Sequence, residues 1–333
     1  MVLSIGYGMD LSSGPYRTDR RSMSNPTYGP ARVTAVLSGL AGMGCVGGGV
    51  AVSGKLADAP LFTTQAVRYS LAAVLLVCAA RLAGRRVVRP RGAEWAWLTG
   101  VAALGLVLFN VALVRGSAHA EPAVLGVAVA CVPVVLAIAD PLLGGRRPGP
   151  TALLGAAVVT AGAVLVQGGG RADRAGLAWT VIVLVCEVGF TLLAVPVLGR
   201  HGPWGVAVHS CWLAAVLLWA LGGANEGLPA ALTLRPAHLL VVGYLAIVLT
   251  ALAFVLWYSA VTGLGAARAG LLTGVAPVAA VGVGVLLGAP VPGVAVWAGI
   301  ALVGVGLAVG LRMPAFGRRR SRLSPRHLAA SRA

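Results

Sequence analysis

The chain has 333 residues, of which 58% are hydrophobic and 11% are charged, and its formal net charge is +17. In soluble domains about a quarter of all residues are charged. This composition therefore excludes an ordinary soluble protein and indicates a polytopic membrane protein. The arginines lie between apolar runs and in the two tails, and they form no patch interleaved with aromatic residues. We therefore expect contact with anionic membrane lipid and no binding of nucleic acid.

The N-terminal tail, residues 1–32, is polar and has no apolar core of the signal-peptide type. We expect it to be disordered and cytoplasmic, and either Met1 or Met23 could be the start of translation. Ten apolar runs follow, each near the roughly 20 residues that a helix needs to cross a bilayer. Their predicted ranges are 33–53, 61–82, 95–114, 121–143, 150–168, 175–198, 203–222, 237–258, 266–288 and 291–311. A basic C-terminal tail, 312–333, ends the chain.

Lipid-spanning runs of this length must be helical, because every backbone polar group has to be satisfied within the segment. The predicted fold is therefore all-α, with ten transmembrane helices. With the N-terminus in the cytoplasm, twenty basic residues fall on the cytoplasmic side and five on the other, while Arg68 lies inside a span. This asymmetry predicts that both termini are cytoplasmic in a multi-pass protein of the cytoplasmic membrane. The excess of arginine over lysine indicates GC-rich coding and hence a bacterium.

An internal repeat appears when the sequence is shifted by 144 residues. Between positions 126 and 162, twelve of thirty-seven residues match those at the shifted positions without a gap, whereas this composition would give roughly four by chance. A weaker echo, "LAAVLL" at 71–76 and 213–218, has a shift of 142. Each half then holds five spans, 33–168 and 175–311, and an odd number predicts halves of opposite orientation. Inverted repeats of this kind are typical of secondary transporters, with a substrate site near the midplane.

Three sets of motifs resemble the drug/metabolite transporter superfamily, and within it the EamA-like ten-helix carriers. The first is "QAVRYSLAAVLLV" in the second span, similar to the arginine-bearing second helix of the family. The second is "ALVRGSAHAEPAVLGVAVACVPVVLAIADPLLGG" with its echo "LWYSAVTGLGAARAGLLTGVAPVAAVGVGVLLG", and the third is "GAAVVTAGAVLV" with its echo "GIALVGVGLAVG". The resemblance covers 33–311 and implies two five-helix repeats that move a small molecule across the membrane.

Two charged residues within spans are the first candidates for the transport pathway, because ionisable groups in membranes are costly and usually functional. Glu187 lies near the centre of the sixth span, where it could bind and release a coupling proton or serve only in helix packing. Arg68 lies about a third of the way into the second span. It could pair with Glu187, bind a substrate carboxylate, or extend to the interface. The family resemblance implies an arginine at this position.

Four other residues have a functional and a structural interpretation. His209 could relay protons or be satisfied by a neighbouring helix, and Asn110 could hydrogen-bond a ligand or join two helices. Trp257 and Tyr258, at the predicted end of the eighth span, could form an interfacial belt or a cavity wall that stacks on substrate.

Two prolines occupy equivalent places in the repeat. Pro133 and Pro277 are 144 residues apart, each inside an apolar run. Such interruptions in membrane helices point toward binding sites. We expect both prolines to kink helices that line the central cavity. The sequence leaves open whether they also act as hinges during the transport cycle.

No pattern in the sequence predicts an enzyme, a bound cofactor or a metal site. The sequence therefore predicts a carrier that exports a small metabolite or amphipathic compound by alternating access, with proton coupling as one option. A carrier of sugars or lipid intermediates and a non-transporting scaffold are the alternatives. A homodimer is compatible with the sequence and not required by it.

Overall fold

The computed structural model describes residues 28–312, which are helical apart from turns and one isolated antiparallel bridge between Ala120 and Ala172. The predictions for most of the two tails, including the choice between Met1 and Met23, lie outside the described residues. In the first half the elements are α1 Tyr28–Ser53, η3 Gly54–Leu56, α2 Leu61–Leu82, α3 Glu94–Gly100, η4 Val101–Leu108, α4 Phe109–Gly116, α5 Pro122–Leu143 and α6 Pro150–Gln167. In the second half they are α7 Arg174–Leu192, α8 Val195–Asn225, η5 Leu228–Thr233, α9 Pro236–Tyr244, η6 Leu245–Leu252, α10 Ala253–Leu264, α11 Ala266–Ala269, η7 Gly270–Gly274, α12 Val275–Leu286 and α13 Val294–Gly310.

Nine helical stretches within residues 28–312 are long and apolar enough to cross a membrane. Three of them are composite: α3, η4 and α4 form one stretch, α9, η6 and α10 another, and α11, η7 and α12 a third. The tenth predicted span corresponds to α13, an apolar helix of 17 residues, which is at the lower limit of about 17 residues for a spanning helix. Nine of the ten predicted spans are thus confirmed as span-length helices.

Two predicted boundaries are wrong by six residues. The sixth span ends at Leu192 rather than 198, and the following segment begins a new helix with a proline in its first turn. The eighth span continues to Leu264 rather than ending at 258. Its polar residues after that point cause no break, because the hydroxyls of Ser259 and Thr262 donate to carbonyl oxygens one turn back in the same helix.

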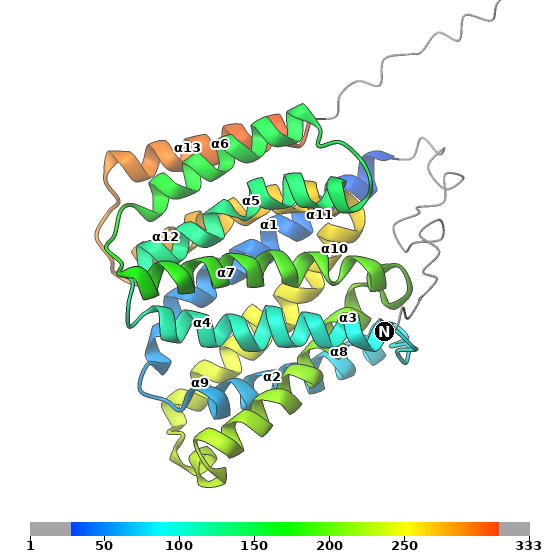
Figure 1. The fold of residues 1–333 in the computed structure, drawn as a ribbon, viewed down its shortest axis with the longest axis vertical. Helices are drawn as coiled ribbons and strands as arrows, with labels where there is room; N and C mark the ends of the chain where they lie inside the picture. Colours follow the sequence, from blue (N-terminus) through cyan, green and yellow to red (C-terminus); the bar gives the residue numbers. More distant parts are fainter. Residues whose placement is uncertain (1–27, 313–333) are drawn as a thin grey trace, which may run out of the picture.

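The helices run between two faces of the molecule (Figure 1). The guanidinium of Arg32, near the start of α1, donates a hydrogen bond to the carbonyl oxygen of Leu311, just after α13. We call the side where α1 begins and α13 ends the terminal face, and the other side the opposite face. The α2–α3 loop and the α7–α8 junction lie at the terminal face, whereas the segment before α2 and the start of α9 lie at the opposite face.

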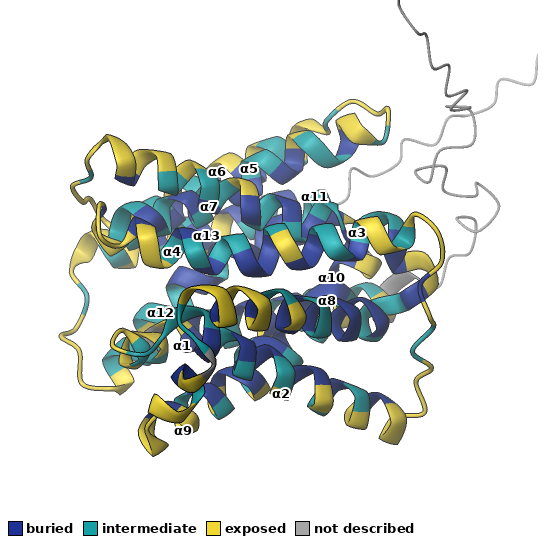
Figure 2. Ribbon diagram, turned by 60° about the horizontal axis from the view of Figure 1, so that its bottom comes forward, coloured by how far each residue is buried: buried dark blue, intermediate teal, exposed yellow. Residues whose placement is uncertain are grey.

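Residues from both halves share one core. Helix α2 packs on α8, α1 packs on α10 and α12, and α6 packs on α13. Exposed residues gather at the helix ends and on the outer sides of the bundle (Figure 2). Because the outer sides are apolar, they suit a lipid environment, and packing between the halves creates the buried interior.

A π-helical segment occurs in the third span of each half, at the spacing of the sequence repeat. The segments are η4 Val101–Leu108 and η6 Leu245–Leu252, so their first and last residues are 144 residues apart. π-Helical turns are rare in proteins, and those that occur are often found at functional sites. Both segments therefore direct attention to the residues around the middle of these two spans.

Asp173 caps the first helix of the second half. Its Oδ1 atom accepts a hydrogen bond of 2.7 Å from the backbone N–H of Gly176, and its Oδ2 atom lies 2.9 Å from Nδ1 of His119. The bond from Gly176, followed by the contact with His119, holds the pKa of Asp173 below its usual range. The carboxylate is thus favoured in the folded protein.

We expect Asp173→Ala to lower the melting temperature at neutral pH, because α7 loses its N-terminal cap. The contribution of the carboxylate is present above the pKa of aspartate in the unfolded chain and disappears as the pH falls through the lower pKa of the folded state. Melting curves of the detergent-solubilised wild type and variant should therefore differ at neutral pH and converge in acid. Asp173→Asn keeps a capping oxygen, so a loss equal to that of Asp173→Ala would contradict this role.

Candidate functional site

A buried arginine on α2 is the strongest feature of the interior. The side chain of Arg68 is only 7% exposed, and its guanidinium carbon lies 4.4 Å from the ring centroid of Tyr69. Its Nη2 atom donates to the hydroxyl of Tyr69, while Nε is buried with no hydrogen-bond partner among the described residues. Arg68 does not extend to the membrane interface, so that alternative is wrong.

Asn110 connects this arginine site to the third span. Its Nδ2 atom donates to the Tyr69 hydroxyl at 3.1 Å and to the carbonyl oxygen of Leu106, within η4, at 2.6 Å. Asn110, in the first turn of α4 after the π-helical segment, therefore holds Tyr69 in place from the neighbouring helix. The hydrogen bond to Tyr69 fits the structural interpretation of Asn110 as a link between two helices. The same Tyr69 hydroxyl also accepts from Arg68, so one side chain separates the amide of Asn110 from the buried guanidinium.

An aromatic cluster from α10 and α7 forms the other part of the site. Trp257 donates from Nε1 to the hydroxyl of Thr191 at 3.3 Å, and Tyr258 donates to the carbonyl oxygen of Phe190 at 3.4 Å. The ring of Phe190 lies 5.1 Å from that of Tyr258 and 5.0 Å from that of Phe254. Because Trp257 and Tyr258 are fully buried, the interpretation as an interfacial belt is wrong.

The arginine site and the aromatic cluster share one buried core. Tyr69 and Tyr258 belong to it together with Cys211 of α8, and Phe190 and Phe254 pack against it. Polar groups come mainly from the first half of the chain and aromatic rings from the second. Such an arrangement suits a ligand with a polar and an apolar end.

Glu187 lies on α7 at the edge of this core. Its carboxylate is within electrostatic range of Tyr258, but no described residue donates a hydrogen bond to it and it forms no ion pair with Arg68 within residues 28–312. The predicted pairing of Arg68 with Glu187 is thus absent from this structure. Glu187 on α7 and Arg68 on α2 are therefore separate candidates for the transport pathway.

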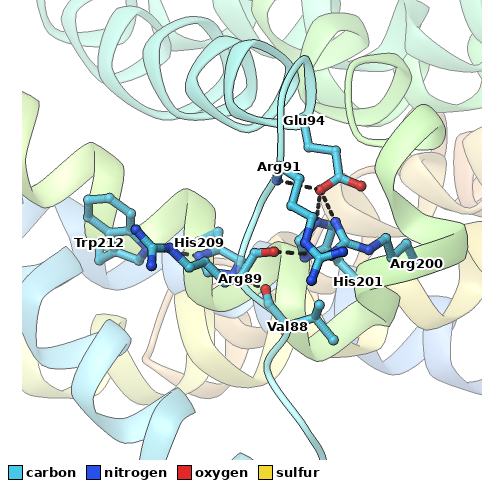
Figure 3. Close-up of polar contacts among 8 residues, drawn as sticks. All are labelled: Val88, Arg89, Arg91, Glu94, Arg200, His201, His209 and Trp212. Carbon is cyan, nitrogen blue, oxygen red and sulfur yellow. Dashed lines mark hydrogen bonds and ion pairs between the residues drawn. The ribbon is translucent and has the colours of Figure 1, made fainter.

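His209 belongs to a different group of residues at the terminal face (Figure 3). Trp212 donates from its Nε1 to Nδ1 of His209 at 3.0 Å, so Nε2 must carry the proton that reaches the carbonyl oxygen of Val88 at 2.9 Å. Both ring nitrogens are therefore engaged by neighbouring elements in a neutral imidazole. This geometry matches the structural interpretation of His209 and gives no support to a proton relay.

The two equivalent prolines lie in different local structures. Helix α5 continues through the buried Pro133 as one helix, whereas Pro277 follows a 3₁₀ turn, η7, that separates α11 from α12. A 3₁₀ turn therefore precedes Pro277, whereas the helix before Pro133 is regular. The kinks expected at the two prolines stay predictions, because a proline can bend a helix without ending it.

The sequence profile of the EamA-like transporter family matches residues 33–167 and again residues 174–311. The chain belongs to the EamA-like transporter family. Known proteins resemble this EamA-like transporter, among them one relative by sequence and one by structure. The "Probable terminal-alkyne amino-acid exporter" of Streptantibioticus cattleyicolor is 30% identical over 262 residues, which cover 78% of this chain and 86% of the exporter. A protein of known crystal structure aligns with a TM-score of 0.69 at 21% identity, over 83% of this chain and 97% of that protein, which shows a shared fold.

The structure of this EamA-like transporter also contains site residues that the sequence did not single out. Tyr69, Phe190 and Thr191 bind Arg68, Tyr258 and Trp257 respectively, yet each is an ordinary residue in an apolar run. The one local signal was the position of Tyr69 directly after a buried arginine. The pairing of Phe190 and Thr191 with α10 depends on tertiary contacts that no local pattern reveals.

Proposed function

We propose that this EamA-like transporter exports a small amphipathic metabolite with a carboxylate group, of the amino-acid class, by alternating access. The observation that carries the proposal is the buried guanidinium of Arg68, which has no carboxylate partner among the described residues and an unbonded Nε atom. Burying a charge without a partner is costly, and a planar carboxylate is the natural partner of a guanidinium. The aromatic rings beside it would receive the apolar end of the same molecule.

The relative from Streptantibioticus supports this substrate class, because an amino acid with a terminal alkyne has both a carboxylate and an apolar side chain. The supporting feature in this chain is that Tyr69, which accepts a hydrogen bond from Arg68, belongs to the same buried core as Tyr258 and its ring partners Phe190 and Phe254. Arg68 would bind the carboxylate, the rings would contact the apolar group, and Glu187 is placed to attract an ammonium group or a proton.

Alternating access is supported by the way the halves pack. A Cβ atom on Gly162 would meet the carbonyl oxygen of Gly299, and one on Gly155 would meet that of Gly306. Shifting the first pair by 144 residues turns it into the second pair with the partners exchanged. Two halves of opposite orientation around a two-fold axis in the membrane plane would produce this exchange. We infer ten spans in all, with α13 as the tenth.

The proposed orientation places the terminal face in the cytoplasm. It is supported by the excess of arginine in the segments that connect to this face, including the α2–α3 loop with Arg85, Arg86 and Arg89. The protein would then reside in the cytoplasmic membrane of a bacterium and move substrate from the terminal face to the opposite face.

The function is tested by comparing metabolites in the medium of cells that express the chain and of cells that lack it. Amino-acid-like compounds should accumulate outside the expressing cells, and the compound with the largest increase should cross liposomes that contain the purified protein. An export profile without carboxylates, or no flux in liposomes, would contradict the proposal.

We expect Glu187→Gln to abolish transport driven by a pH gradient, because the amide cannot bind and release a proton. Exchange of labelled for unlabelled substrate at equal pH should continue. The measurement is flux into proteoliposomes with and without an imposed pH gradient. Glu121→Gln, on an exposed loop at the opposite face, is the matched control. If flux driven by the pH gradient runs at the wild-type rate in Glu187→Gln, this residue is excluded as the coupling group.

A further inference from the structure

A cluster of charged residues ties the first half of the chain to the second at the terminal face (Figure 3). The carboxylate of Glu94, at the start of α3, accepts a hydrogen bond from Arg200 and lies 3.1 Å from Nε2 of His201. It also accepts from the backbone N–H of Arg91 at 2.8 Å. The side chain of His201 is 0% exposed and that of Glu94 is 23% exposed, so this cluster is largely shielded from water.

A second cluster ties the two halves together at the opposite face. Asp58, in the segment before α2, accepts from Nη1 of Arg235 at 3.2 Å and lies 3.2 Å from Nε2 of His238, near the start of α9. The carboxylate is again shared by one arginine and one histidine. Here the side chains of Asp58 and Arg235 are 56% and 71% exposed, so water screens this cluster more strongly.

The two clusters occupy corresponding positions in the repeat. Glu94 and His238 are 144 residues apart, the shift of the main repeat, and Asp58 and Arg200 are 142 residues apart, the shift of the "LAAVLL" echo. At each of these two pairs of equivalent positions, one half has the acidic residue of its cluster and the other half has a basic residue of the other cluster. Each cluster therefore joins the start of a third span to the beginning of a second span of the other half, within the first turns of α8 at one face and just before α2 at the other.

We propose that these clusters are the two gates of the transport cycle: Glu94, Arg200 and His201 at the terminal face, and Asp58, Arg235 and His238 at the opposite face. The assignment rests on the proposed alternating-access function. Opening either face by moving one half against the other separates the carboxylate from its bases at that face. The structure has both gates closed, and the cycle opens them one at a time.

The terminal-face gate is the stronger of the two. Its histidine and carboxylate are more buried, and partly buried ion pairs are screened less than exposed ones. A second contact between the halves lies beside this gate. Nε2 of His209, on α8, hydrogen-bonds the carbonyl oxygen of Val88 in the α2–α3 loop, and the ring centroids of His201 and His209 lie 5.4 Å apart. Removing the carboxylate should therefore have a larger effect at the terminal face.

The test uses native Cys211 as a reporter, since its thiol is buried in the core beside Tyr69 and Tyr258. The other four cysteines are replaced, and a membrane-impermeant maleimide is applied to intact cells or to inside-out vesicles. Glu94→Gln should raise the labelling rate from the terminal face by about tenfold and lower it from the opposite face. Asp58→Asn should raise it from the opposite face by about threefold.

Matched controls keep the exposed charges at each face comparable. Glu121→Gln breaks an exposed ion pair with Arg171 at the opposite face, and Arg86→Gln removes an exposed arginine from the α2–α3 loop; neither should change labelling. Arg200→Gln and Arg235→Gln provide second variants of each gate. The gate assignment is wrong if both carboxamide variants label at the wild-type rate from both sides or change labelling at the same side. Labelling needs no substrate, so a failed export assay leaves this test intact.

Discussion

Arg68→Met should abolish export while leaving the protein at least as stable as the wild type. The guanidinium is buried, it has no carboxylate partner within the described chain, and its Nε atom has no acceptor. Methionine removes the buried charge and keeps an unbranched apolar side chain, and replacing buried charges by apolar groups is often neutral or stabilising. The contact with the Tyr69 ring offsets part of this gain, because a cation over an aromatic ring contributes about 0.5–2 kcal/mol.

The loss of transport should be large because the charge would meet a substrate carboxylate. Hydrogen bonds to charged groups contribute about 1.5–3 kcal/mol, so we expect the rate of export at low substrate concentration to fall by about tenfold to a hundredfold. Arg68→Lys keeps the charge without the planar pair of donors. Its export rate should lie between those of the wild type and Arg68→Met. Initial flux rates and melting temperatures of the same preparations give both numbers.

Arg171→Met is the control for this substitution, since it removes an exposed arginine from a loop at the opposite face. It should change neither flux nor melting temperature. Transport by Arg68→Met at the wild-type rate would exclude the carboxylate site. A strong loss of stability would show that the arginine has a structural role in the empty protein.

The sequence predicted Arg68 and Asn110 because polar side chains in a membrane need a reason to be there. It could not predict that the hydroxyl of Tyr69 joins them, since a tyrosine in an apolar run is unremarkable. For Trp257 and Tyr258 the sequence left a belt and a cavity wall open, because the span was predicted to end at 258; the helix continues past them, and the hydroxyls of Ser259 and Thr262 bond to their own helix.

The spans themselves were largely predictable, because helices that face lipid must be apolar over a fixed length. The second predicted span coincides with α2. Contacts between the halves were less accessible. Glu94 and His201 are 107 residues apart, and neither lies in a pattern that marks a partner. The repeat shift relates Glu94 to His238, but only the structure shows that both belong to clusters of one carboxylate, one arginine and one histidine.

The backbones of α6 and α13 approach each other closely, and there a single methyl group should be costly. A Cβ atom on Gly162 would lie 2.7 Å from both the carbonyl oxygen of Gly299 and the nitrogen of Val303, and one on Gly306 would lie 2.6 Å from the nitrogen of Val159. These neighbours are backbone atoms of the facing helix, so they cannot rotate away. The added atom can be accommodated only if the helices separate.

We therefore expect Gly162→Ala and Gly306→Ala each to lower the free energy of unfolding by about 1–3 kcal/mol, the usual cost of an extra carbon in a tightly packed interior. The two losses should be similar, because Gly162 and Gly306 occupy equivalent places in the repeat. Gly304→Ala is the control: it lies on α13, and its Cβ atom would meet no other heavy atom within 4 Å. Alanine there should be neutral or slightly stabilising, since it restricts the unfolded chain.

Denaturation in mild detergent with increasing sodium dodecyl sulfate, followed by tryptophan fluorescence, measures all three variants under one condition. Equal midpoints for Gly162→Ala and Gly304→Ala would contradict the close packing of α6 on α13. A large loss for Gly162→Ala without one for Gly306→Ala would contradict the symmetric relation of the two contacts. Similar losses in both, with the control unchanged, would mean that the same glycine contact is made twice, once from each half, as an alternating mechanism built on two equivalent halves requires.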